Sequence, residues 1–227
     1  MNDPVRHDEL IRWSEALAGI ARTGLGFTTN PYERERFEEV LAVAADIQAR
    51  SSEASLEADA FHGEWMKTVG SGISGYVTPK IAVGAVVGDD EGRLLLIQRA
   101  DSGVWLYPTG WADVGYSAAE VAVKEVLEET GIRCEVIEPL AIHDGLRLGF
   151  SRVPLYSIVF LCRAVGGSLQ PHPQECLDAG WFHREELPTP VASFERWGDL
   201  AYAAIQGEPF TAQFDEPRDP VWRGRKD

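Results

Sequence analysis

Residues 105–132 read WLYPTGWADVGYSAAEVAVKEVLEETGI and carry the strongest local signals in the chain. Ser117 is followed three residues later by Glu120, which is the pattern of a capping box and predicts that a helix begins there. Gly131 supplies the left-handed residue at which such a helix ends. The stretch therefore predicts a turn with the sequence Pro-Thr-Gly-Trp, followed by a capped helix over residues 118–130.

This helix carries three glutamates on one face, Glu125, Glu128 and Glu129, because positions i, i+3 and i+4 lie together on a helix. Like charges at this spacing weaken an isolated helix, whereas hard divalent cations such as Mg2+ bind clustered carboxylate oxygens. A solvated acidic face would give the same pattern, and the triplet alone favours that interpretation. Its position after a glycine-containing turn and inside a capped helix favours a metal site instead.

The stretch resembles the Nudix hydrolase signature, G-x5-E-x7-R-E-U-x-E-E-x-G-U, in which U is an apolar residue. Gly110 corresponds to the first glycine, and the spacing matches through to Ile132. Two positions differ, because Tyr116 stands where the family has Glu and Lys124 stands where it has Arg. In the family these two side chains pair and brace the loop against the helix. We therefore expect the hydroxyl of Tyr116, or its ring through a cation–π contact, to face Lys124.

The resemblance implies a Nudix-type α/β/α sandwich with a mixed sheet, and a hydrolysis assisted by Mg2+, for which Mn2+ is an alternative. It implies that Glu125 and Glu129 bind the metal directly, and that Glu128 is a further ligand or positions the attacking water. In the family the backbone carbonyl that corresponds to Thr109 also joins the metal ligands. A diphosphate would be repelled by these carboxylates unless divalent cations lay between them, and such cations also lower the pKa of bound water.

Five further side chains are candidates for contact with the substrate or the attacking water. In many relatives the base is a carboxylate on a later loop, and Glu175 has a similar position; a plain surface glutamate is the equal alternative. Arg99 ends a predicted strand and is a candidate for contact with phosphate, although a solvated arginine is common at such a position. Trp105, Tyr107 and Trp111 are candidates to stack on a nucleobase, and core packing is the alternative for at least one of them.

Beyond residue 76 the hydrophobic pattern changes to that of β-strands. Five strands are predicted, at residues 80–87, 93–98, 134–142, 153–164 and 180–183. A second helix in this part is predicted at residues 194–206. Strands with helices between and after them indicate a mixed sheet flanked by helices. Residues 77–206 are therefore predicted to form this domain, and residues 207–227 a loosely ordered tail.

Residues 1–69 are predicted to form a small all-helical domain. Apolar residues at helical spacing predict three helices, at about residues 10–24, 31–47 and 53–66. Gly24 and Gly26 are expected to end the first of them. Residues 70–76 are rich in Gly and Ser and are predicted to be the linker to the following domain.

This helical segment is similar to the domain that precedes the Nudix domain in a bacterial Nudix subgroup. The similarity lies in RWSEAL (residues 12–17), IARTGL (residues 20–25) and YERERF (residues 32–37). Members of that subgroup act on nucleoside diphosphates linked to another group, with CDP-choline and ADP-ribose among their substrates, and tend to dimerise. The resemblance implies a homodimer in which the added helices cap the partner's site.

The composition argues against several classes of protein. The 227 residues include 21 Lys and Arg against 36 Asp and Glu, a net charge of −15 that argues against a protein coating duplex nucleic acid. The first residues lack the pattern of a signal peptide, and the most apolar run, residues 153–162, is too short to span a bilayer. Three widely spaced cysteines indicate no disulfide framework. We expect a soluble cytoplasmic protein that binds neither duplex nucleic acid nor membranes.

The sequence thus predicts an enzyme that binds a small nucleotide. The expected reaction is Mg2+-dependent hydrolysis of the diphosphate linkage of a nucleoside-diphosphate-X, which gives a nucleoside monophosphate and phosphorylated X. One alternative is a Nudix-fold nucleotide-binding module or regulator with weak or no catalysis, which the changes at Tyr116 and Lys124 suggest. Another is hydrolysis at RNA ends; the acidic composition argues against long RNA, whereas the basic end of the tail, residues 223–226, keeps this alternative open.

Overall fold

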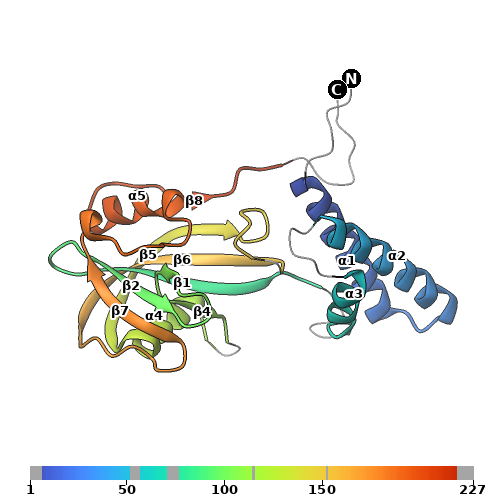
Figure 1. The fold of residues 1–227 in the computed structure, drawn as a ribbon, viewed down its shortest axis with the longest axis horizontal. Helices are drawn as coiled ribbons and strands as arrows, with labels where there is room; N and C mark the ends of the chain where they lie inside the picture. Colours follow the sequence, from blue (N-terminus) through green and yellow to red (C-terminus); the bar gives the residue numbers. More distant parts are fainter. Residues whose placement is uncertain (1–6, 52–56, 71–76, 114–115, 152, 219–227) are drawn as a thin grey trace, which may run out of the picture. The chain divides into compact units, whose positions relative to one another are not determined.

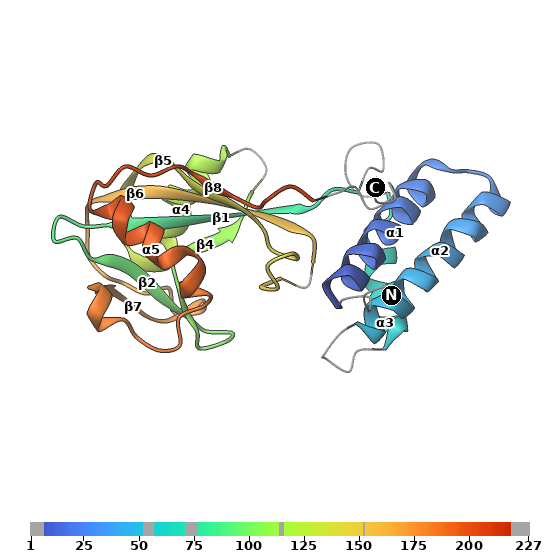
Figure 2. The ribbon, with the colours of Figure 1, turned by 90° about the horizontal axis from the view of Figure 1, so that it is seen from above.

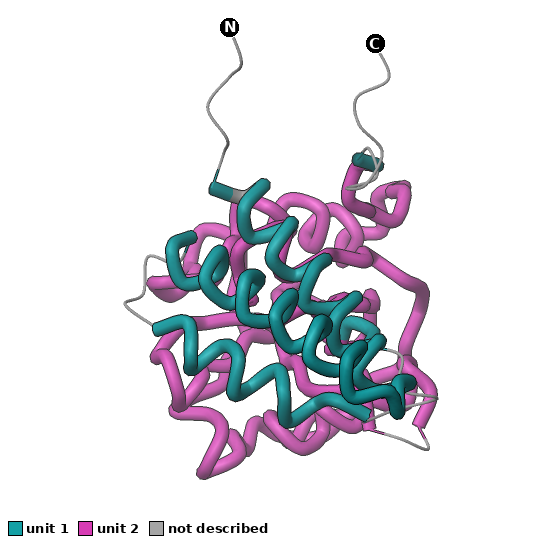
Figure 3. Tube along the Cα trace, turned by 90° about the vertical axis from the view of Figure 1, so that its right-hand side faces the viewer, with its two compact units in different colours: residues 1–79, 217–227 teal, residues 80–216 magenta. Residues whose placement is uncertain are grey.

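The computed structural model describes residues 7–51, 57–70, 77–113, 116–151 and 153–218 of the chain. The chain divides into two compact units, residues 1–79 with 217–227 and residues 80–216, which Figure 3 shows in different colours. The predicted linker lies outside the described residues except for Gly70. No helix in the described ranges combines the length and the apolarity that crossing a membrane requires.

The described part of the first unit contains three helices, α1 (His7–Phe27), α2 (Pro31–Arg50) and α3 (Ala58–Met66). The side chain of Asn30 caps α2 by accepting a hydrogen bond of 2.9 Å from the backbone N–H of Tyr32. The predicted start of the third helix, residues 53–56, lies outside the described residues. These helices form the helical bundle that the sequence predicts.

Of the two glycines predicted to end the first helix, Gly24 lies inside it, because α1 continues to Phe27, one residue beyond Gly26. A Cβ atom at Gly24 would lie 2.4 Å from the ring of Phe37 on α2. The glycine therefore serves the close approach of two helices and not the end of one. Small side chains continue this contact, and the buried core of the unit consists of Ala18, Ala21, Leu25, Leu41, Ala44, Ala45 and Trp65.

The second unit is built on a mixed sheet of eight strands (Figure 1). The strands are β1 (Lys80–Gly88), β2 (Leu94–Arg99), β3 (Trp105–Leu106), β4 (Thr109–Trp111), β5 (Ile132–Asp144), β6 (Leu155–Gly167), β7 (Cys176–Phe182) and β8 (Gln213–Phe214). Their order is β3-β2-β1-β6-β5-β8, with β4 paired to β1 and β7 paired to β2. The pairs β1–β6 and β5–β8 are parallel, and the other pairs are antiparallel.

Two helices, α4 (Ala118–Thr130) and α5 (Phe194–Ile205), cover opposite faces of this sheet, as Figures 1 and 2 show. Alternate residues of β1 divide between the two faces, because successive side chains of a strand point in opposite directions. Val83 and Val87 pack with α4, whereas Val86 packs with α5. A short 3-10 helix, Arg184–Glu186, follows β7. The α/β/α sandwich with a mixed sheet is therefore confirmed.

Three details of the strand assignment differ from the sequence-based expectation. Strands β3 and β4 contain only two and three residues and show no pattern long enough to be recognised. Strand β7 begins at Cys176, four residues before the predicted start. The segment predicted as a loose tail contains β8, in which Gln213 pairs with Ala141 of β5. These short strands are set by pairing with distant partners, which the local sequence does not encode.

Candidate active site

The helix α4 is held at both ends as the sequence predicts. The backbone N–H of Glu120 donates to the Ser117 hydroxyl at 3.3 Å, and the Glu120 carboxylate accepts from the Ser117 N–H at 2.6 Å. Gly131 ends the helix with φ of 73°, and its N–H donates to the carbonyl of Leu127. This fixes the direction in which the glutamates of α4 project.

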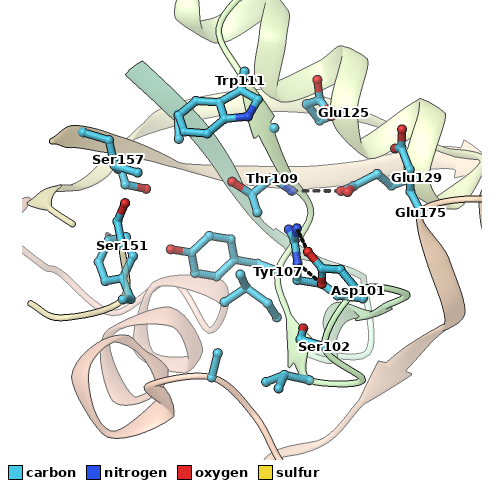
Figure 4. A pocket seen from close by; sticks show the side chains of 18 of the residues that line it. Asp101, Ser102, Tyr107, Thr109, Trp111, Glu125, Glu129, Ser151, Ser157 and Glu175 are labelled. Atoms are coloured by element: carbon cyan, nitrogen blue, oxygen red, sulfur yellow. Dashed lines mark hydrogen bonds and ion pairs between the residues drawn. The ribbon is translucent and has the colours of Figure 1, made fainter. Parts of the chain in front are cut away.

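Two glutamates of α4 are buried beside strand β4. The exposed fractions of Glu125 and Glu129 are 8% and 4%, whereas Glu128 is exposed. A Cβ atom at Gly110 would lie 2.3 Å from the carboxyl carbon of Glu125, so any side chain at this position of β4 would displace the Glu125 carboxylate. The Glu129 carboxylate accepts a hydrogen bond of 2.8 Å from the backbone N–H of Thr109 (Figure 4). The backbone at Thr109 and Gly110 thus lies against both carboxylates. We call these two residues the cradle.

Burial makes both carboxylates costly to ionise. It is the main cause that raises the pKa of Glu129 to about 8, and the nearby charges of Glu125 and Glu175 act in the same direction. The Thr109 N–H and the charge of Arg99 oppose this shift. The pKa of Glu125 is also raised, again mainly by burial. Such an environment favours a bound cation, which would stabilise the ionised form of both groups.

The third glutamate is engaged by Lys124. The Lys124 ammonium lies 2.8 Å from Glu128, 3.5 Å from Glu125 and 3.4 Å from Asp113. These carboxylates, the Glu128 hydrogen bond foremost, raise the pKa of Lys124. The expected contact with Tyr116 is replaced by the pair with Asp113, and the Tyr116 residue is 53% exposed. Carboxylates stabilise an ammonium more strongly than a phenol does, which accounts for the difference.

The oxygen atoms around this cradle are of the kind that bind a hard divalent cation, but the side chains alone do not supply three converging ligands. Among the described residues, no three His, Cys, Asp or Glu side chains converge closely enough to hold a metal ion by themselves. The ion pair between Glu128 and Lys124 holds one of the three α4 carboxylates. Glu125 and Glu129 remain as two buried oxygen donors with raised pKa, and a cation beside them would compensate their charge.

A pocket of about 880 Å3 opens beside the cradle. Figure 4 shows Glu125, Glu129 and Glu175 on one side of it. Arg99 also lines the pocket, and its guanidinium pairs with Asp101 at 2.8 and 3.1 Å. Glu175 is exposed at the rim, where its backbone carbonyl accepts a hydrogen bond of 2.8 Å from Ala100. The structure therefore brings the predicted carboxylates and Arg99 to one pocket.

The two candidate tryptophans have different environments. Trp111 lines the pocket with 51% exposure, and the Lys80 ammonium lies 5.1 Å from the centre of its ring. Trp105 is 7% exposed and packs edge-to-face on Phe182 at 5.2 Å, outside the pocket lining. The structure places Trp105 in the hydrophobic core, which removes it from the candidate substrate contacts, whereas Trp111 remains accessible for stacking.

Two residues of the pocket lining on the central strands, Ala82 of β1 and Ser157 of β6, were not selected from the sequence. Trp111, Ala82, Ser157 and His143 are paired in one row across β4, β1, β6 and β5, and all four line the pocket. Tyr107 also lines it, with its ring over Gly84, where a Cβ atom would lie 2.4 Å away. Ser157 interrupts an apolar strand, which is a weak signal that a sequence can show. The row itself depends on strand register and has no local signature.

Comparison with known proteins places this chain in a family. Residues 78–199, more than half of the chain, match the model described as NUDIX domain, and residues 8–58 match "UDP-X-like, N-terminal oligomerisation domain". YjhB of Bacillus subtilis (strain 168), named provisionally as an ADP-ribose pyrophosphatase, is 32% identical over 180 residues, which cover 77% of this chain and 81% of YjhB.

Two solved structures agree with this assignment. A UDP-X diphosphatase is 27% identical with a TM-score of 0.54, and the match covers 93% of this chain and 100% of that one. An ADP-ribose pyrophosphatase from Streptococcus suis 89-1591 is 32% identical with a TM-score of 0.53, and the match covers 61% of this chain and 100% of that one. The match to the NUDIX domain over more than half of the chain, together with the cradle beside α4, shows that this protein belongs to the Nudix hydrolase family.

Proposed function

We propose that this protein hydrolyses the diphosphate linkage of a nucleoside-diphosphate-X of the CDP-choline or ADP-ribose type, giving a nucleoside monophosphate and phosphorylated X. The observation that carries the proposal is the pair of buried carboxylates, Glu125 and Glu129, held by Gly110 and Thr109 at the wall of a large pocket. The names of similar proteins, an ADP-ribose pyrophosphatase and a UDP-X diphosphatase, support the same class of substrate.

We propose Mg2+, with Mn2+ as an alternative, as the cation of this site. Glu125, Glu129 and the backbone carbonyl of Thr109 would hold it, and Glu128 would join them or position the water once it leaves Lys124. The bound cation would offset the charge of the diphosphate and lower the pKa of water. The raised pKa of the two buried carboxylates supports this assignment, because burial disfavours their ionised forms and a bound cation would stabilise those forms.

The remaining roles fall to residues at the pocket. Water attacks one phosphorus, the bond from that phosphorus to the bridging oxygen breaks, and the other phosphate leaves with that oxygen. Glu175, at the rim near Glu129, is the candidate that accepts the proton of the attacking water or serves as an auxiliary ligand. Arg99 is the candidate for contact with phosphate, and Trp111 for stacking on the base. Each of these three assignments can be tested by a single substitution.

A substrate panel tests the proposed reaction. The full chain is incubated with CDP-alcohols, ADP-ribose, nucleotide sugars and nucleoside triphosphates in Mg2+, and the products are identified by chromatography. We expect nucleoside monophosphate and phosphorylated X from at least one diphosphate-linked substrate, and little turnover of triphosphates. Folded protein that hydrolyses none of these compounds would contradict the proposal.

The ion pair between Lys124 and Glu128 supports a second candidate function. At 2.8 Å it holds one of the three α4 carboxylates, and a site with two carboxylates could bind a nucleotide without hydrolysing it efficiently. This protein would then be a nucleotide-binding module or regulator. Titration calorimetry separates the two candidates, since tight binding of a nucleoside-diphosphate-X that stays intact over hours supports the second.

We also propose that the protein is a homodimer through its first unit. The match of residues 8–58 to an oligomerisation domain supports this proposal. Trp13, Ile20 and Phe27 of α1 are spaced by seven residues, which places them on one side of the helix, and they are 37%, 60% and 55% exposed. Light scattering at several protein concentrations measures the assembly.

A further inference from the structure

One side of the pocket is formed by the loop that follows β5, residues 145–151, which we call the wall loop. Its residues Leu148, Phe150 and Ser151 line the pocket. Figure 4 shows Ser151 across the pocket from Glu129. The wall loop therefore lies opposite the buried carboxylates, and it offers apolar side chains and a hydroxyl to the part of a substrate that lies beyond the phosphates.

Hydrogen bonds to two residues at the end of β5 give the wall loop its shape. The Asp144 carboxylate accepts from the backbone N–H groups two and three residues ahead, both at 3.1 Å. An aspartate side chain that binds the backbone in this way is typical of the start of a turn. The Gly145 carbonyl accepts from the N–H groups of Phe150 and Ser151, both at 3.1 Å. The positions of these two lining residues thus depend on how the end of β5 is held.

The end of β5 is held by residues that come much later in the chain. Strand β8 pairs with β5 just before the wall loop. The next residue, Asp215, accepts a hydrogen bond of 2.6 Å from the backbone N–H of Asp144. The side chain of Arg147, in the wall loop, donates to the backbone carbonyl of Glu216. These two contacts join residues 71 and 69 positions apart, and we call residues 215–216 the C-terminal clamp.

The contact made by Asp215 is the stronger part of this clamp. Hydrogen bonds to an ionised carboxylate are shorter and about twice as strong as those between neutral groups. Asp215 and Asp144 are both half-buried, which limits the access of water that could replace the contact. Loss of the Asp215 side chain would therefore remove the acceptor of the N–H group at the residue from which the wall loop turns.

We infer that Asp215 is a positioning residue of the substrate pocket, which holds Asp144 and thereby the wall loop against the bound substrate; where it concerns the substrate, this rests on the proposed function. The clamp lies in the segment that the sequence predicts as a loose tail. Because the wall loop lies across the pocket from the cradle, its contacts contribute equally to the ground state and the transition state. Loss of the clamp should therefore raise KM and leave kcat nearly unchanged.

Hydrogen–deuterium exchange tests the clamp without any substrate. The amides of the wall loop are followed in full-length wild type, Asp215→Ala, Asp215→Asn and Glu216→Ala. Asp215→Ala should accelerate their exchange roughly tenfold, since a hydrogen bond to a charged group is lost. Asp215→Asn removes the charge, which lies near His143, but keeps an oxygen acceptor, so it should restore most of the protection. Glu216→Ala is the matched control, because it removes an exposed carboxylate and keeps the backbone carbonyl that Arg147 binds.

Kinetics on the same proteins test the consequence for the substrate. With ADP-ribose in Mg2+, or the compound of the substrate panel that wild type hydrolyses faster, Asp215→Ala should raise KM roughly tenfold and change kcat less than about threefold. Asp215→Asn and Glu216→Ala should stay close to wild type. Thermal unfolding shows whether each variant is folded. If Asp215→Ala does not fold, Arg147→Met, which removes the second contact of the clamp, takes its place with the same expected direction.

Three results would overturn the inference. The first is exchange of the wall loop that does not change in Asp215→Ala. The second is faster exchange with an unchanged KM, since the wall loop would then not hold the substrate. The third is an Asp215→Asn variant as impaired as Asp215→Ala, because the charge of Asp215 and not its position would then matter.

A failure of the proposed function is recognised separately. If wild type hydrolyses no compound of the panel, the proposed reaction is contradicted, whereas the exchange measurement still decides whether Asp215 holds the wall loop. Calorimetric titration with ADP-ribose then replaces KM, and Asp215→Ala should bind it roughly tenfold more weakly than wild type. Equal affinities of the two proteins, including the absence of binding by both, would overturn the inference.

Discussion

The Lys124 ammonium lies 3.4 Å from the Asp113 carboxylate, and this ion pair joins the loop after β4 to the helix that carries the glutamates. The Nudix signature normally has a Glu at the position of Tyr116 and an Arg at that of Lys124. In this protein the acidic partner comes from three residues earlier, while Tyr116 faces solvent. The connection between loop and helix is therefore kept with different residues.

The first prediction concerns this ion pair. Asp113→Asn should lower kcat roughly tenfold, because a loop that is no longer tied to α4 misplaces Gly110 and Thr109 relative to the glutamates. Its effect on the free energy of unfolding should stay below about 1 kcal/mol, since the pair is partly solvent-exposed. Steady-state kinetics and thermal unfolding measure the two quantities.

Two variants make this prediction specific. Asp90→Asn, in the exposed turn between β1 and β2, is the control and should leave kcat unchanged. Adding Tyr116→Glu to Asp113→Asn should recover much of the lost activity, because it returns a carboxylate to the loop. An Asp113→Asn enzyme with full activity would show that Lys124 needs no partner on the loop.

The second prediction concerns Glu129. Glu129→Gln keeps an acceptor for the Thr109 N–H and removes the negative charge, so it should lower kcat by a factor of 100 or more, on the order of 3 kcal/mol in the transition state. It should also raise the Mg2+ concentration needed for half-maximal activity. Glu138→Gln, an exposed residue of β5 outside the pocket, is the control. Unimpaired turnover by Glu129→Gln would exclude this residue from the reaction.

The third prediction concerns the glycine of the cradle. Gly110→Ala should reduce activity severely, because the added methyl group would lie 2.3 Å from the Glu125 carboxyl carbon and would displace this carboxylate, whereas its effect on the free energy of unfolding should stay below about 1 kcal/mol. Gly63→Ala in α3 is the matched control, since it has no atom within 4 Å, and it should be neutral or stabilising by about 0.5–1 kcal/mol. Chemical denaturation and kinetics of both variants measure the contrast. Equal behaviour of the two variants would refute the close approach at Gly110.

The fourth prediction is a pH dependence located in the first unit. Burial raises the pKa of Glu15 to about 7, and the charge of Arg22 only partly opposes this shift. The folded state therefore holds a proton that the unfolded state releases, so Glu15 makes the protein less stable as the pH rises from about 4.5 through 7. Its contribution amounts to at most about 3 kcal/mol.

Glu15→Gln isolates this contribution. The variant should be more stable than wild type at pH 8 and about equally stable at pH 4.5, as measured by unfolding at several pH values. Glu35→Gln, on the exposed surface of α2, is the control, and its free energy of unfolding should change with pH as that of wild type does. If the free energy of unfolding changes with pH in the same way for wild type and Glu15→Gln, the pKa of Glu15 is not raised in the folded protein and the prediction is contradicted.

The fifth prediction concerns assembly. Ile20→Asp should weaken the proposed dimer by about tenfold or more, because one buried isoleucine contributes roughly 1.5–3 kcal/mol. Ile137→Asp, an equally exposed isoleucine on β5 of the second unit, is the control and should leave the assembly unchanged. Light scattering at several protein concentrations measures the dimer dissociation constant of each variant and of wild type. If Ile137→Asp weakens the dimer and Ile20→Asp does not, the interface lies on the second unit and the proposal is contradicted.

The sequence alone determined the features that depend on neighbours within one helical turn. The capping box at Ser117, the stop at Gly131 and the spacing of the three glutamates are all encoded locally, and the structure confirms the helix that they predict. The same signals identified the family. Periodicity likewise gave the long strands and the helices of the first unit, because burial of one face imposes a repeat on the chain.

Only the tertiary structure decided which side chains meet. Trp105 and Trp111 look alike in the sequence, yet one is in the core and the other lines the pocket. Lys124 takes Asp113 and not Tyr116 as its partner. The row of Trp111, Ser157 and His143 requires the register of strands far apart in the chain. Register and burial are set by the whole sheet, so no stretch of sequence contains them.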